Sequence, residues 1–325
     1  MGLTPVSWGI VSTGHINRLV IPGAHESDLV DLVAVASRDA ARAEEYAQRW
    51  GIERAYGGYE ALLEDPEVEA VYISLPNSLH CEWSIRALEA GKHVLCEKPM
   101  SRRAAEVETA FDAAERAGRL LMEGFMYRHN SQTRKLQDIV RSGAIGRLRL
   151  IRAAFSFTAR NPHDIRLLPE LDGGALMDVG CYCVSSSRLL AGEPERVFGE
   201  QLPGATGVDV VFVGTLSFPD GVTAQFDCGL ALPERDELEA IGDDGSLFLD
   251  DPWHCRVPVI ELRRDREVER IELAPEDSYR VELENLSAAI RNEAEPLLGR
   301  ADAVGNARAI EALYASAATG APLRF

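Results

Sequence analysis

Apolar and polar positions alternate with two different rhythms along this chain, and the rhythm changes after Phe125. Before it, short apolar runs typical of buried strands are separated by stretches in which apolar residues recur every three or four positions, as in helices. The predicted strands are 6–11, 29–37, 70–75, 93–97 and 120–123, with helices at about 15–24, 40–50, up to 90, and 101–117. Strand–helix alternation at this spacing predicts a parallel, doubly wound sheet.

After Phe125 strand-like runs follow one another without crossover helices, which favours a mostly antiparallel sheet. We therefore expect two domains, residues 1–125 and residues 126–325, with the C-terminal helix able to pack back onto the first. The predicted helices of this part are 131–142, 280–293 and 301–319, and the predicted strands are 148–157, 210–218, 222–228, 237–241, 246–249 and 260–263.

Composition and charge narrow the function classes. The 325 residues are 46% hydrophobic and 26% charged, as in soluble globular proteins. No run of 18 apolar residues and no secretory signal is present, so we expect no membrane association. The net charge of −18 argues against nucleic-acid binding. The six cysteines form neither a C-x-x-C pair nor a zinc-finger spacing, which favours a reducing cytoplasm and predicts no metal.

The first chemical motif is the turn between the first predicted strand and helix, "WGIVSTGHIN" at 8–17. Such a turn aims the helix N-terminus at a pyrophosphate. Of the G-x-G-x-x-G/A fingerprint only the middle glycine is present, because Ser12 and Asn17 occupy the outer positions. A plain loop is the alternative. The predicted phosphate-binding backbone comprises Ser12, Thr13, Gly14, His15 and Ile16.

The end of the second predicted strand bears on cofactor preference. NAD-preferring sites usually place a carboxylate there, whereas this chain has Ser37 and Arg38. A hydroxyl and a guanidinium suit a 2′-phosphate, which predicts NADP, with NAD also possible. The alternative is a surface arginine followed by Asp39 as a helix cap.

Two further strand ends point into the expected crevice. Leu75, Pro76 and Asn77, with His80 nearby, follow the strand that should face the nicotinamide, although Asn77 as a helix cap explains this segment equally well. The stretch "HVLCEKPM" at 93–100 places Glu97 and Lys98 at a strand tip before Pro99. A lysine held there is a point charge beside a reacting centre, so we predict that Glu97 and Lys98 contact the cofactor.

In "DGGALMDVGCYCV", residues 172–184, Asp178 and Tyr182 stand four positions apart and share a helix face. Asp172 and the glycines predict the start of that helix. A phenol has a pKa of about 10 and is a poor base at neutral pH, but a nearby ammonium stabilises the phenolate. Lys98 and Tyr182 therefore complement each other, whereas without Lys98 a core tyrosine would be the better interpretation.

Together the nucleotide turn, "EKP", "EGFMYR" at 123–128 and "GGALMDVGCY" at 173–182 resemble the glucose–fructose oxidoreductase/inositol dehydrogenase/rhizopine catabolism family over nearly the whole chain. The resemblance implies an α/β fold, in which an N-terminal Rossmann doubly wound parallel sheet precedes a C-terminal domain with a large, mostly antiparallel open-faced sheet. Tyr182 stands where many members have histidine, which is similar to the branch of dimeric dihydrodiol dehydrogenases and NADP-dependent D-xylose 1-dehydrogenases.

This resemblance implies that Lys98, Tyr182 and Asp178 act on a sugar, polyol or diol in an NAD(P)-dependent hydride transfer, with Tyr182 exchanging the hydroxyl proton. Arg166 is a further candidate for substrate binding. We expect Lys98 and Tyr182 to converge across a cleft beside the nicotinamide. A homodimer or dimer of dimers through the C-terminal sheet is also implied.

Two other functions of the same fold stay open: an NAD-dependent glycoside hydrolase and a non-catalytic sugar- or dinucleotide-sensing regulator. The intact Lys98 and Tyr182 argue against the regulator. Trp253 and His254, in "DDPWHC" at 250–255, fit either a pocket lining or a buried loop anchor.

Overall fold

A computed structural model of the protein describes residues 4–325 and divides the chain into two compact units. The first unit consists of the chain up to Met126 together with Asp277–Val304, and the second of Tyr127–Glu276 together with Gly305–Phe325. Each unit is therefore built from two separate stretches of sequence.

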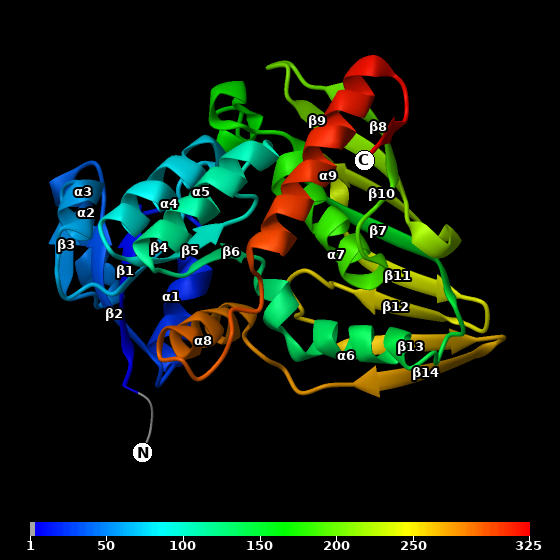
Figure 1. Ribbon diagram of the computed structural model, residues 1–325, viewed down its shortest axis with the longest axis horizontal. Coiled ribbons are helices and arrows are strands. Elements are labelled where there is room, and N and C mark those ends of the chain that lie inside the picture. The colour runs from blue at the N-terminus through cyan, green and yellow to red at the C-terminus, as the bar shows by residue number, and fades with distance from the viewer. Residues whose placement is uncertain (1–3) are drawn as a thin grey trace. The chain divides into compact units, whose positions relative to one another are not determined.

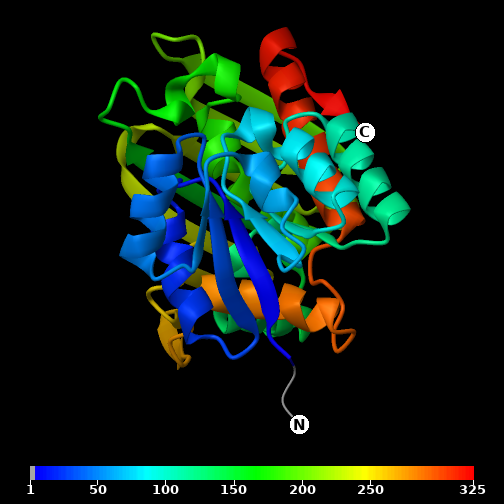
Figure 2. The ribbon, with the colours of Figure 1, turned by 90° about the vertical axis from the view of Figure 1, so that its left-hand side faces the viewer.

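The first unit contains a six-stranded sheet in the order β3-β2-β1-β4-β5-β6, and all its neighbouring strands run parallel. This is the strand order of a Rossmann fold, so the predicted doubly wound sheet is confirmed. Figure 2 shows β1 and β2 side by side in dark blue. The strands are β1 (Val6–Val11), β2 (Val30–Ala36), β3 (Arg54–Tyr56), β4 (Ala70–Ile73), β5 (His93–Glu97) and β6 (Leu121–Gly124).

Helix ends in the first unit follow local sequence signals. The Asp39 carboxylate caps the second helix by accepting from the Arg42 backbone N–H at 2.8 Å. Gly51 and Gly118 adopt the left-handed conformation that ends a helix. The helices are α1 (Asn17–Glu26), α2 (Ala40–Trp50), α3 (Tyr59–Leu63), α4 (His80–Glu89), α5 (Ala104–Ala117) and α8 (Ser278–Ile290).

Helix α8, from the later stretch of sequence, packs against α1 in the first unit. The buried Trp8 indole on β1 donates a hydrogen bond to the Ser287 hydroxyl at 3.1 Å. At the same end, the Arg291 guanidinium pairs with the Glu69 carboxylate at 2.7 Å. These contacts make residues 277–304 part of the core around β1.

The second unit contains a nine-stranded sheet in which β7 and β10 run parallel and the other pairs are antiparallel. The predicted mostly antiparallel sheet is confirmed (Figure 1). Its order is β14-β13-β12-β11-β7-β10-β9-β8-β15. The strands are β7 (Leu148–Thr158), β8 (Arg196–Pro203), β9 (Asp209–Ser217), β10 (Thr223–Gly229), β11 (Ala231–Gly242), β12 (Ser246–Asp250), β13 (Val259–Arg264), β14 (Glu267–Glu272) and β15 (Leu323–Arg324).

Helices pack on one face of this second sheet. Helix α6 (Ser131–Arg141) contacts β13, and α7 (Cys181–Ala191) contacts β7 and β10. Helix α9 (Arg300–Thr319) begins in the first unit and continues in the second. Among residues 4–325 every helix falls short of the length and apolarity that crossing a bilayer requires.

Candidate functional site

The turn after β1 keeps a glycine-like backbone without the first fingerprint glycine. Ser12 adopts a φ of 108°, which L side chains rarely take. Its hydroxyl donates to the Ser74 carbonyl at 2.8 Å and accepts from the Gly14 N–H at 3.0 Å. The buried Asn17 side chain donates to the Ser12 carbonyl at 3.0 Å. The residues that replace fingerprint glycines therefore hold the turn through their side chains.

Gly14 is the fingerprint position at which glycine is required. A Cβ atom there would lie 2.9 Å from the Ser74 carbonyl oxygen, closer than real Cβ atoms approach backbone. The close approach draws the turn against the end of β4, and α1 begins three residues later. Thr13, Gly14 and Ile16 are half-buried and His15 is exposed, so this segment has surface to offer a ligand.

At the end of β2, Ser37 is buried and its hydroxyl accepts from the Asp39 N–H at 3.3 Å. Arg38 is exposed. Burial raises the pKa of the Tyr59 hydroxyl, while the Arg38 and Arg42 guanidinium groups oppose the rise, so both cations lie near this ring. Two cationic side chains, Arg38 and Arg42, therefore lie near the end of β2. The sequence pattern indicated only Arg38.

His80 joins the segments that follow β4 and β5. Its ring is buried, with Nε2 2.7 Å from the Leu75 carbonyl oxygen and Nδ1 2.9 Å from the Pro99 carbonyl oxygen. Burial lowers the pKa of His80. The two helices that follow begin at Asn77 and His80, and their N-cap residues, Pro76 and Leu79, make no side-chain cap hydrogen bond.

The carboxylate of Glu97 points into the first unit. It accepts a short hydrogen bond from the Tyr72 hydroxyl and one from the Lys98 backbone N–H at 3.3 Å. Burial and the nearby Glu97 raise the pKa of Glu282 well above its usual range. Glu97 therefore anchors the backbone at Lys98, and its predicted contact with a cofactor stays a prediction.

In the second unit, Asp178 lies on a π-helix, Leu176–Gly180, that leads directly into α7 and Tyr182. The helix begins at Ala175, directly after the glycines as predicted, whereas Asp172 takes the left-handed conformation and ends a preceding turn. Arg166 Nε donates to Asp178 Oδ2 at 2.8 Å, which with the neighbouring Asp164 raises the pKa of the guanidinium. The Asp178 carboxylate is 17% exposed, so it remains accessible while Arg166 orients it.

Three aromatic rings surround the ring of Tyr182. The centroids of Tyr127, Phe155 and Trp253 lie 5.7, 5.4 and 5.8 Å from its centroid. Trp253 is fully buried, and its indole N–H donates to the Ala154 carbonyl at 3.4 Å. This aromatic box fixes the direction of the phenol and places Trp253, as the sequence suggested, in a buried loop anchor.

Asp209, at the start of β9, stabilises the start of the helix that carries Asp178 and Tyr182. The sequence pattern did not identify it as a site residue. Its buried carboxylate accepts from the Leu176 backbone N–H at 2.7 Å and from the Tyr314 hydroxyl at 2.9 Å. A Cβ atom on Gly174 would lie only 2.2 Å from Asp209 Oδ1. Gly174 therefore makes room for the carboxylate that caps the helix of Asp178 and Tyr182.

Comparisons with known proteins find matches for both parts of the chain. Residues 6–125 match the family described as an oxidoreductase family with an NAD-binding Rossmann fold, and residues 133–248 match the GFO/IDH/MocA C-terminal domain.

Three relatives are similar over most of their length. The D-xylose 1-dehydrogenase (NADP(+)) 2 of Haloferax volcanii is 39% identical over 97% of this chain and 98% of its own. The trans-1,2-dihydrobenzene-1,2-diol dehydrogenase of Mus musculus is 38% identical over 76% of this chain and 75% of its own. The crystal structure of a 3-ketoreductase from Actinomadura kijaniata, in complex with NADP and TDP-benzene, superposes with a TM-score of 0.91 at 32% identity, covering 96% and 98% of the chains.

Proposed function

Because the chain belongs to the GFO/IDH/MocA family of oxidoreductases, we propose that it oxidises a carbinol of a sugar-like substrate, or reduces the corresponding carbonyl, with NADP as cofactor. The observation that carries this proposal is the turn after β1, where Ser12 takes a glycine-like φ and Gly14 closes on Ser74 at the switch point between β1 and β4.

The residues present fit a dinucleotide. Gly14 leaves space at the start of α1, where Thr13 to Ile16 would hold the pyrophosphate through backbone N–H groups. The exposed Arg38, with Ser37, would hold the ribose 2′-phosphate. Leu75, Pro76 and Asn77 would line the nicotinamide side. When bound, the nicotinamide supplies or accepts the hydride.

The protein supplies the proton and the orientation. On oxidation the substrate hydroxyl gives its proton to the Tyr182 oxygen, and on reduction Tyr182 returns it. We infer that the Lys98 ammonium assists this transfer by stabilising the phenolate form of Tyr182. Asp178, oriented by Arg166, accepts a hydrogen bond from a neighbouring substrate hydroxyl. The aromatic box holds the phenol in one direction, which lowers the entropic cost of the transition state.

Sugar-like substrates suit this pattern of groups. A carboxylate and a phenol one helical turn apart match the neighbouring hydroxyls of a sugar or diol. The similar D-xylose and dihydrobenzenediol dehydrogenases are named for substrates of this kind.

A panel of free aldoses, inositols and diols, read as NADPH absorbance with each cofactor, tests the function. We expect at least one aldose or diol to reduce NADP. Cleavage of a glycoside without net NADPH formation would instead support the hydrolase alternative.

Tyr182→Phe then tests the mechanism, with an expected loss of kcat of roughly 10²–10⁴. Lys98→Met should also lower kcat, whereas the matched variant Lys135→Met, on an exposed position of α6, should not. Near-normal turnover of Tyr182→Phe would show that Tyr182 does not exchange the proton of the substrate hydroxyl.

We also propose that a second copy of the chain covers the open face of the second sheet, in a homodimer or dimer of dimers. This face carries ion pairs, such as Arg235 with Asp227 at 2.5 Å, and the exposed Val213, around a hollow of about 500 Å³. Val213→Glu should lower the mass measured by light scattering, and an unchanged mass would contradict the proposal.

The six free cysteines support a reducing, cytoplasmic location.

A further inference from the structure

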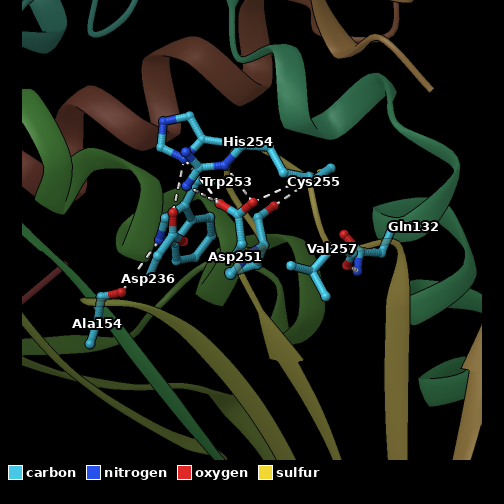
Figure 3. Close-up of polar contacts among 10 residues, drawn as sticks. Gln132, Ala154, Asp236, Asp251, Trp253, His254, Cys255 and Val257 are labelled. Carbon is cyan, nitrogen blue, oxygen red and sulfur yellow. Dashed lines mark hydrogen bonds and ion pairs between the residues drawn. The ribbon is translucent and has the colours of Figure 1, made fainter. Parts of the chain in front are cut away.

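The loop between β12 and β13 contains a histidine held by two carboxylates (Figure 3). His254 Nδ1 lies 2.9 Å from Asp236 Oδ2 on β11 and 3.1 Å from Asp251 Oδ1. The Arg256 guanidinium binds the other oxygen of Asp251 at 2.7 Å. We call these four residues the His254 cluster; Asp236, Asp251 and Arg256 are the charged groups that act most strongly on the imidazole.

The two carboxylates of the cluster lie inside the protein and the imidazole lies at its edge. Their side chains are 9% and 8% exposed, against 32% for His254. Because Nδ1 faces both carboxylates, Nε2 is the ring nitrogen left for a ligand. A histidine oriented in this way by carboxylates is prepared to donate from its outer nitrogen.

His254 lies one aromatic ring away from Tyr182. Its ring meets Phe155 edge-to-face at 5.6 Å between centroids, and Phe155 meets Tyr182 at 5.4 Å. Trp253, the neighbour of His254 in sequence, is itself part of the aromatic box. The imidazole is therefore within reach of the part of a sugar-sized substrate that extends beyond the carbon next to Tyr182.

A proton suits the His254 cluster better than a metal ion. The ligand atoms of Asp236, Asp251 and His254 lie within 4.8 Å of one another, as a metal site requires. However, a cation would have to displace the Nδ1 proton that both carboxylates share and compete with Arg256 for Asp251. Two carboxylates and two cationic side chains already balance in charge.

We propose that His254 determines substrate specificity: its Nε2–H donates a hydrogen bond to a substrate oxygen beyond the reacting carbon, while Asp236 and Asp251 hold the ring in its charged form. The inference rests on the proposed function, because Tyr182 marks the reacting carbon. The two carboxylates raise the pKa of His254 to about 9, although burial opposes the charge.

The test compares the best sugar with its single-deoxy analogues in wild type, His254→Phe and His254→Gln. In wild type, one deoxy analogue should lose kcat/KM by about 10- to 100-fold, the range for a hydrogen bond to a charged group. His254→Phe should lower kcat/KM for the full sugar by the same factor and abolish this discrimination. His254→Gln, which retains a donor, should keep part of it. His25→Gln, at an exposed histidine of α1, is the matched control and should keep all of it.

A pH series separates hydrogen bonding from packing. The discrimination should fall as the pH rises through about 9 in wild type, because Nε2 then loses its proton, and should not change with pH in His254→Gln. An equal loss of kcat/KM for all sugars in His254→Phe, with no pH dependence, would overturn the proposal and leave a packing role. Loss of discrimination only on addition of EDTA would show instead that the His254 cluster binds a metal.

Thermal stabilisation by the sugar, measured with NADP present, distinguishes this inference from the proposed function. Suppose that the sugar stabilises wild type but not His254→Phe, and that wild type forms no NADPH. This result would refute hydride transfer and support the role of His254. NADPH formation with undiminished discrimination in His254→Phe would refute only the role of His254.

Discussion

Replacement of Asp209 by alanine removes the carboxylate that caps the helix of Asp178 and Tyr182. The mutation breaks two hydrogen bonds, from the Leu176 N–H at 2.7 Å and from the Tyr314 hydroxyl at 2.9 Å. Asp209 is 4% exposed, so water does not readily replace the lost acceptor. The variant therefore leaves a helix N–H group and a phenol without the partner that each has in wild type.

The expected loss of stability follows from these contacts. A hydrogen bond to a charged group contributes about 1.5–3 kcal/mol, and removal of the buried charge offsets part of the sum, so we expect Asp209→Ala to lose about 3–4 kcal/mol. Tyr314→Phe removes only the second bond and should lose about 1.5 kcal/mol. Asp209→Asn keeps one acceptor and should lose about 1–2 kcal/mol.

Thermal unfolding measures these changes, since each kcal/mol lowers the Tm of a domain of this size by about 2–4 °C. Asp138→Ala, at an exposed position of α6, is the matched control and should shift the Tm very little. Because a looser helix start displaces Tyr182, Asp209→Asn should also lower kcat by about tenfold. A Tm for Asp209→Ala within 2 °C of wild type would refute the capping argument.

Three further results are expected. Arg38→Ala should raise KM for NADP by about 10- to 100-fold and leave KM for NAD unchanged, and equal effects on both cofactors would contradict the 2′-phosphate contact. Ser12→Gly should be nearly neutral in Tm because relief of the positive φ offsets two lost hydrogen bonds, whereas Ser12→Ala keeps the strain and should lose about 2 kcal/mol. The pKa of His254 is raised from 6.5 to about 9, so its contribution to the free energy of unfolding is present at pH 6.5 and lost as the pH rises through about 9. The Tm difference between wild type and His254→Gln should shrink over this range, and a constant difference would argue against the charged imidazole.

The sequence pattern predicted best the strands that are buried on both faces. β1 and β5 have the predicted bounds, because a continuous apolar run between turn residues defines a parallel strand. β3 and α3 were not predicted, since three half-buried residues and a single helical turn are too short to show a period. β14, almost wholly exposed at the sheet edge, lacks the apolar alternation that identifies a strand.

The candidate site shows a different limit of the pattern. Ser12 replaces the first glycine of the fingerprint, yet its backbone has the positive φ typical of glycine. Hydrogen bonds of its side chain with Ser74 and Gly14 stabilise this conformation. Asp209 gave no signal at all, because its function depends on a contact with a helix 33 positions away in the chain. The family resemblance, drawn from short motifs in the right order, is confirmed over both matched regions.

The two-part construction of the first unit has a consequence for synthesis. When residues up to Met126 have left the ribosome, the indole of Trp8 and the carboxylate of Glu69 still lack their partners on Ser287 and Arg291. The intervening segment takes roughly 8–30 s to translate at bacterial and eukaryotic rates. The nascent Rossmann sheet must therefore wait, incomplete and with the site for α8 uncovered, until almost the whole chain has emerged, and chaperones have their longest opportunity to bind it during that interval.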